Sequence, residues 1–157
     1  MPQRPTHRLN LYLVPQGSTA DPESLLSALV EWGVLEGMKP GPQATEFVEG
    51  GFALLRVDRP GRELVYGNRQ GGFRVRCPDC DANMVAAFGA ARANDAEVTC
   101  DACGATRDHR ALNFLPDVAF GELAVELRDV GAAVLTPQGE EVVRRHLGLF
   151  AIIGSRG

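Results

Sequence analysis

Cys77-Pro78-Asp79-Cys80 opens a stretch that ends, after nineteen further residues, at Cys100-Asp101-Ala102-Cys103-Gly104 and that holds every cysteine of the 157-residue chain. Two CxxC pairs at this spacing are typical of a tetrahedral tetrathiolate zinc site, because each pair can turn both sulfurs toward the metal on one tight loop. Four Zn–S bonds close such a site, so no coordination position is left for water or substrate. The sequence therefore predicts structural zinc as the cofactor, bound by Cys77, Cys80, Cys100 and Cys103.

Three other interpretations of the four cysteines compete with zinc. Disulfide bonds are disfavoured, because paired CxxC units are typical of metal sites and nothing in the sequence indicates export. A thioredoxin-like redox pair needs only one CxxC and leaves the other unexplained. Iron of the rubredoxin type fits a thiolate tetrahedron as well as zinc does, so the spacing does not separate these two metals.

The motif resembles the zinc ribbons, a rubredoxin-like family of small metal-binding units, at Cys77-Pro78-x-Cys80 and Cys100-x-x-Cys103-Gly104. Ribbons commonly carry Gly after the second cysteine of each loop, whereas Asp81 follows Cys80 here, and Asp tolerates positive φ less readily than Gly. The chain also resembles uncharacterised bacterial proteins that join a Leu-Tyr-Leu-Val-Pro strand, here residues 11–15, to such a ribbon. These resemblances imply a metal-braced unit and no activity.

Composition and charge narrow the class of protein. The apolar share of 45% is that of a globular protein, and no run of eighteen apolar residues predicts a membrane-spanning helix. The formal charge is −4, and four thiolates with one Zn²⁺ bring it to about −6. An acidic protein is not a general nucleic-acid binder by net charge. Residues 1–14 do not read as a signal peptide, so a reducing cytoplasm is the expected location of the four thiols.

Periodicity predicts two similar halves. Alternating apolar residues indicate a strand at 8–14. Asp21-Pro22 and Thr136-Pro137 each begin a capped helix, and the first runs from about 22 to 32 or 35. Further strands are expected at 45–48, 52–57, 118–127 and 149–153. The two β–α–β halves predict an α+β fold: a ferredoxin-like split βαβ sheet with two helices, carrying an inserted zinc ribbon. Leu135–Glu140 also offers a weaker winged-helix interpretation.

The domain prediction follows from these elements. Residues 1–58 and 114–157 form the α+β domain, and residues 59–113 form the inserted ribbon. Within the ribbon we expect a hairpin of strands 64–66 and 73–76, a short Ala-rich helix at 84–93 and a strand at 97–99.

Motifs of known catalytic chemistry do not appear in the sequence. It has no P-loop, no GxSxG elbow and no HExxH. The histidines His7, His109 and His146 are far apart, and His109 is interpreted as a surface or packing residue because a tetrathiolate site is complete without it. Glu122 and Glu126 alternate with apolar residues, which favours a solvated strand face over a catalytic carboxylate pair.

Arginines concentrate just before the first cysteine. Six lie between positions 56 and 76, against the two acids Asp58 and Glu63. One interpretation is an anion or nucleic-acid contact through Arg62, Arg69, Arg74 and Arg76. The other, slightly favoured, is that these arginines lie on exposed strand faces and offset the thiolates.

The favoured functional hypothesis is a non-enzymatic, cytoplasmic zinc-ribbon protein that acts as a protein-interaction module, such as an adaptor, regulator or immunity-type protein. Its expected partner is another protein, and neither a membrane nor a small-molecule substrate is indicated. One alternative is a nucleic-acid-binding zinc-ribbon protein that uses the arginine-rich patch. The other is a rubredoxin-like electron carrier.

Overall fold

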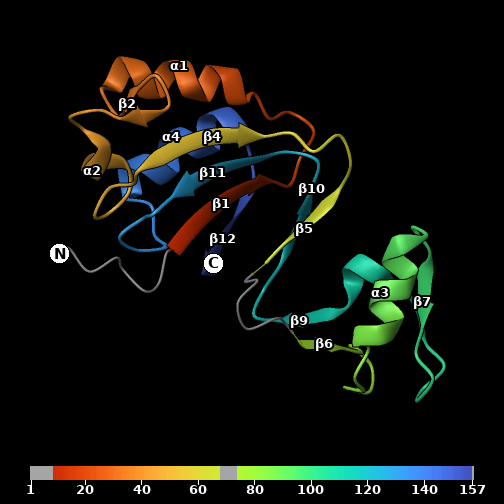
Figure 1. Ribbon diagram of the computed structural model, residues 1–157. Coiled ribbons are helices and arrows are strands. Elements are labelled where there is room, and N and C mark those ends of the chain that lie inside the picture. The colour runs from red at the N-terminus through yellow and green to blue at the C-terminus, as the bar shows by residue number, and fades with distance from the viewer. Residues whose placement is uncertain (1–8, 68–73, 157) are drawn as a thin grey trace. The chain divides into compact units, whose positions relative to one another are not determined.

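The computed structural model describes residues 9–67 and 74–156 (Figure 1). The chain forms two compact units: residues 1–70 with 119–157, here called the sheet unit, and residues 71–118, called the cysteine unit. These bounds differ from the predicted 59 and 113. The reason is that β5 (Leu64–Tyr66) and β10 (Ala119–Gly121), which flank the insertion, pair with each other inside the sheet unit.

The sheet unit is built on one four-stranded antiparallel sheet. Its main elements are β1 (Leu9–Pro15), α1 (Pro22–Trp32), β4 (Leu54–Asp58), β11 (Ala124–Arg128), α4 (Pro137–Leu147) and β12 (Phe150–Arg156). The strand order is β12-β1-β11-β4, and each neighbouring pair is antiparallel (Figure 1). Consequently β1 and β4, which α1 connects, run in the same direction with β11 between them. The same holds for β11 and β12, which α4 connects and β1 separates. The described residues thus form a mixed α/β structure with antiparallel sheets.

Both predicted helix starts are confirmed. Asp21 accepts a hydrogen bond from the Ser24 N–H at 3.1 Å, and Thr136 Oγ1 accepts one from the Gly139 N–H at 2.9 Å. A proline follows each capping residue, where its missing N–H leaves no helical bond unmade. Gly33 then ends α1 in the left-handed conformation with φ 88°.

Two predicted strands are different in the structure, and one short hairpin was not predicted. Residues 45–48 do not form a strand, because α2 (Ala44–Phe47) buries Ala44 and Phe47 on one side of a helical turn. The predicted strand 118–127 is interrupted after Gly121, where a Cβ would lie 2.7 Å from Val14 Cγ1, and it divides into β10 and β11. The unpredicted hairpin follows α1 and consists of β2 (Leu35–Glu36) and β3 (Lys39–Pro40).

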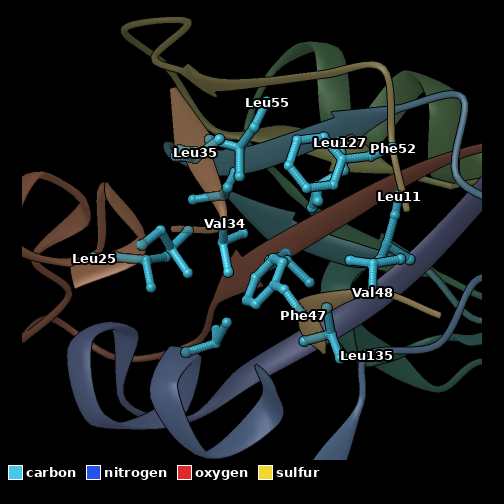
Figure 2. Close-up of a cluster of buried hydrophobic side chains, with 14 of the residues drawn as sticks. Leu11, Leu25, Val34, Leu35, Phe47, Val48, Phe52, Leu55, Leu127 and Leu135 are labelled. Carbon is cyan, nitrogen blue, oxygen red and sulfur yellow. The ribbon is translucent and has the colours of Figure 1, made fainter. Parts of the chain in front are cut away.

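The main core lies between the sheet and the two long helices. The central strands contribute Leu11, Leu13, Val125 and Leu127, and the helices contribute Leu25, Leu29, Val143 and Leu147. Figure 2 shows Phe47 and Val48 pointing into this cluster beside Leu11 and Leu135. The opposite sheet face carries a smaller cluster, in which Tyr66 and Ala119 from the β5–β10 pair contact Val14, Ala124 and Ile153.

The cysteine unit has two short strand pairs and one helix. Its elements are β6 (Arg74–Arg76), α3 (Val85–Ala93), β7 (Glu97–Thr99), β8 (Thr106–Asp108), the 3-10 turn η1 (His109–Ala111) and β9 (Asn113–Leu115). The pairs are β6 with β9 and β7 with β8. The predicted hairpin of 64–66 with 73–76 is therefore wrong, since β5 and β6 pair with other strands; most of its 67–72 tip lies outside the described residues. The helix predicted at 84–93 is confirmed as α3. Among the described helices, none combines the length and the apolar character that crossing a bilayer requires.

Candidate metal centre

The four cysteine sulfurs converge on one point. All four Sγ atoms lie within 4.8 Å of one another, with 3.7 Å from Cys77 to Cys103 and 3.6 Å from Cys80 to Cys100. Metal–sulfur bonds of about 2.3 Å in a tetrahedron place the sulfurs about 3.8 Å apart, whereas a disulfide requires about 2.05 Å. The four cysteines are free. The cluster is therefore compatible with one tetracysteine-bound metal ion.

The two cysteine loops have the same backbone design. In the first, the Asp81 N–H donates to the Cys77 carbonyl at 2.9 Å, and in the second the Gly104 N–H donates to the Cys100 carbonyl at 2.8 Å. Asp81 and Gly104 both adopt positive φ, 63° and 78°. Asp81, the one departure from the ribbon pattern, thus takes the backbone conformation that Gly104 takes in the other loop.

Backbone amides that follow the cysteines by two positions favour negative charge on the sulfurs. Asp79 donates to Cys77 at 3.4 Å. The backbone amides of Ala82, Ala102 and Ala105 each act to lower the pKa of the thiol two positions earlier, at Cys80, Cys100 and Cys103. Such bonds stabilise negative charge on sulfur, as a tetrathiolate site requires.

The thiol pKa values indicate whether the four sulfurs can all be ionised without a metal. The Cys103 amide, together with that of Ala102, lowers the pKa of Cys100 to about 7 in spite of desolvation. The Ala82 amide lowers the pKa of Cys80, but lost hydration and hydrogen bonds with the other thiols outweigh it and raise the value to about 12. Full ionisation of all four sulfurs therefore calls for a cation among them.

An ion pair connects the two cysteine loops. Asp79, inside the first loop, accepts hydrogen bonds from Arg107 Nη2 at 2.6 Å and Nε at 3.0 Å. Arg107 lies on β8, directly after the second loop, and its own pKa is raised by this contact. The pair is part-exposed, so we assign it a positioning role and a small energy.

The predicted arginine site is divided. Arg62 is exposed in the sheet unit, Arg69 lies outside the described residues, and Arg74 and Arg76 lie on β6 in the cysteine unit. Arg74 and Arg76 share the strand face opposite buried Val75, and Arg76 Nη1 donates to the Asp81 carbonyl at 3.3 Å. The structure therefore places two of the four together and ties one of them to the first cysteine loop.

His109 is a packing residue, as predicted. It is 2% exposed, and its ring centroid lies 6.0 Å from that of Phe88 on α3. Its Nδ1 is 3.3 Å from the Ala96 carbonyl oxygen. His109 therefore packs in the small core of the cysteine unit.

The expectation of a solvated face is wrong for Glu126. This residue is 3% exposed, and its two carboxylate oxygens accept from Arg56 Nε at 2.5 Å and from Arg128 Nε at 3.1 Å. Glu126 is directly opposite Arg56 in the β11–β4 register. Arg128 lies two positions further along the same strand, whereas only the pairing register brings Arg56 to Glu126, so the alternation within one strand did not predict the burial of this carboxylate.

A second polar contact also depends on tertiary structure. Ser24 Oγ on α1 and His146 Nδ1 on α4 are 2.6 Å apart, although 122 positions separate them. Both side chains are half-buried, and the contact joins the two helices at the end where α1 begins and α4 finishes. No sequence signal connects the two residues.

These observations define a mixed α/β protein with a tetracysteine cluster suited to a metal ion. Comparison of the chain with protein-family models, with curated proteins and with solved structures gave no match. Function is therefore argued from the residues and their geometry.

Proposed function

We propose that Cys77, Cys80, Cys100 and Cys103 hold one structural Zn²⁺ and that the cysteine unit is a zinc ribbon. The sulfur spacing, the matched backbone bonds of the two loops and the Asp79 N–H donated to Cys77 support this proposal. Zinc bound by four thiolates supplies folding energy and has no open position for chemistry. The cysteine unit, residues 71–118, would then be an insertion into a ferredoxin-like domain. The strand order β12-β1-β11-β4 and the two β–α–β halves support that fold.

The proposed function is that of a non-enzymatic, cytoplasmic protein-interaction module whose partner is a protein with a basic surface. The observation that carries it is the charge of the cysteine unit, which has five arginines and seven acids in residues 71–118. Thiolates and zinc add a further −2. Of these acids, Glu97, Asp101 and Asp117 are exposed and form no ion pair within the described residues. A closed metal site in a unit with this excess of acids favours a cationic protein surface over a phosphate backbone.

Affinity purification of the tagged, zinc-loaded full chain from its native host tests this function. We expect a protein partner that is released by salt and lost from the variant Glu97→Gln/Asp101→Asn/Asp117→Asn. The matched control is Glu31→Gln/Glu36→Gln/Glu49→Gln, which removes three exposed acids from the sheet unit and should keep the partner. Equal recovery with both variants, or recovery of no protein, contradicts the proposal.

Nucleic-acid binding is the second candidate, and the shared face of Arg74 and Arg76 on β6 favours it. Each phosphate contact should steepen the salt dependence of binding by about one counterion. DNA or RNA retained at low salt, and released by Arg74→Gln/Arg76→Gln, would establish this candidate in place of the first.

Metal analysis tests the site itself. Colourless protein with one equivalent of zinc is expected. A coloured, iron-containing centre would instead support the rubredoxin-like electron carrier.

A further inference from the structure

We propose that β12 is a self-association edge, at which two copies of this chain pair their β12 strands antiparallel about a two-fold axis. The proposal concerns the sheet unit and is independent of the metal centre and of the function proposed above. Figure 1 shows β12 at the margin of the sheet, next to β1.

The direction of each backbone group of β12 follows from its pairing with β1. The Gln16 N–H donates to the Leu149 carbonyl at 2.8 Å, and the same register continues through Tyr12 opposite Ile153. Because hydrogen-bonded pairs alternate along an antiparallel ladder, Ala151, Ile153 and Ser155 direct their N–H and C=O groups to β1. Pro15, which has no N–H, is opposite Phe150. This is a non-hydrogen-bonded pair of the ladder, so the missing N–H costs no bond to β12.

Phe150, Ile152 and Gly154 therefore direct their N–H and C=O groups away from the sheet. Within residues 9–67 and 74–156, no backbone group accepts from or donates to them on that side. An edge of this kind is a template for another strand.

The opposite edge of the same sheet is protected by devices that residues 150–155 of β12 lack. At β4, the outward Leu55 N–H donates to the Met38 carbonyl at 2.9 Å, and β4 carries Arg56 and Asp58 before the chain reaches Pro60. Along β12, residues 150–155 read Phe-Ala-Ile-Ile-Gly-Ser, with no charge and no proline. An edge strand is usually protected by charged residues, prolines or a covering segment. Residues 150–155 contain no charged residue and no proline.

A second copy is the occupant that fits this edge. When two β12 strands pair antiparallel with Ile152 on the axis, Phe150 is opposite Gly154 of the other copy, and every outward N–H meets an outward C=O. Residues 150–155 of two copies bring no like charges together when they pair, although the whole chain carries −4. Ile152, which is 37% exposed in the single chain, would contact its own counterpart across the axis. One strand pair buries less than a standard interface, so we expect micromolar or weaker affinity.

Sedimentation of the zinc-loaded full chain, from low micromolar to millimolar concentration, measures this association. The mass should rise from 16.9 kDa toward twice that value. Ile152→Lys places two like charges on the axis and should raise the dissociation constant at least about tenfold, with the fold retained. The matched control is Val30→Lys, which changes an apolar side chain 52% exposed on α1 and should leave the dissociation constant unchanged.

Amide hydrogen exchange identifies the strand. The amides of Phe150, Ile152 and Gly154 should become protected only as the dimer forms, whereas those of Ala151, Ile153 and Ser155 should be protected at every concentration. A chain that stays monomeric at millimolar concentration overturns the proposal. So does a dimer that is insensitive to Ile152→Lys, or one in which the three outward amides stay unprotected. Occupation of this edge by a strand of a different protein would overturn it as well.

Discussion

The two units of the chain reach a folded state by different means. The sheet unit buries a continuous set of aliphatic and aromatic side chains between four strands and two helices, with Leu11, Leu29 and Leu127 fully inaccessible. The cysteine unit buries a few large apolar residues, such as Val75, Phe88 and Leu112, and brings four thiols together beside them. Small units with little apolar core commonly depend on a metal. The comparison predicts that each unit will fail under a different perturbation.

Removal of the metal should have the largest effect. Structural zinc in small domains contributes an apparent binding free energy of about 10–16 kcal/mol, which here is available only to the cysteine unit. We expect a chelator, or Cys100→Ser, to open residues 74–118 to proteolysis and hydrogen exchange, while β1, β11 and β12 stay protected. Ala102→Ser changes the same loop without removing a ligand and serves as the control. Simultaneous loss of protection in both units would show that the sheet unit depends on the metal as much as the cysteine unit does.

The reverse perturbation is a cavity in the sheet unit. Leu127→Ala truncates a fully buried side chain of β11 and should lower the free energy of unfolding of this unit by about 2–5 kcal/mol. The zinc content should not change. Denaturant titration followed by the fluorescence of Trp32, a residue of the sheet unit, measures the free energy of unfolding. Metal analysis measures the zinc content. Leu149→Ala, at a position 72% exposed, should cost little and controls for the loss of a leucine as such.

Features that depend on local interactions were predicted from the sequence, whereas features that depend on long-range pairing were not. The spacing of Cys77, Cys80, Cys100 and Cys103 predicted a metal cluster because ligand spacing is a local constraint, and the Asp21 and Thr136 caps predicted two helices for the same reason. The partners of β5 and β6 were not predictable, because each pairs with a strand that follows the second cysteine pair. The buried Glu126 was missed likewise, since it is neutralised by Arg56, which is seventy positions away. Residues 45–48 were misassigned because burial of Phe47 outweighed a weak strand pattern.

Alkaline pH gives a smaller effect that is confined to the sheet unit. Burial and then a 2.9 Å hydrogen bond to Asp58 raise the pKa of Tyr66 above its ordinary value of 10.0. A raised pKa means that the neutral phenol is favoured in the folded state, so its contribution is complete below pH 10 and is lost as the pH rises further. We expect the stability of the sheet unit to fall above pH 10.

Tyr66→Phe separates this effect from general alkaline unfolding. The variant keeps the ring against Tyr12 and loses the Asp58 bond, at a cost of about 1 kcal/mol at neutral pH. Denaturant titrations between pH 8 and pH 11 should then show a weaker decline than in the wild type. An identical decline in both proteins would show that another group titrates.

The smallest expected effect concerns the two cysteine loops, which differ mainly in the residue that takes positive φ. Asp81 adopts φ 63° where Gly104 adopts 78°, and its backbone bonds to Cys77 and Arg76 do not use its side chain. Asp81→Gly should therefore relieve about 0.5–1 kcal/mol of backbone strain, part of which the more flexible unfolded chain offsets. Zinc affinity measured by chelator competition should rise by less than about tenfold. Gly104→Asp should lower it by a similar factor.

Asp81→Asn keeps the size of the side chain and removes its charge. If Asn reproduced the gain seen with Gly, repulsion between the carboxylate and the thiolates, rather than φ, would distinguish the first loop from the second.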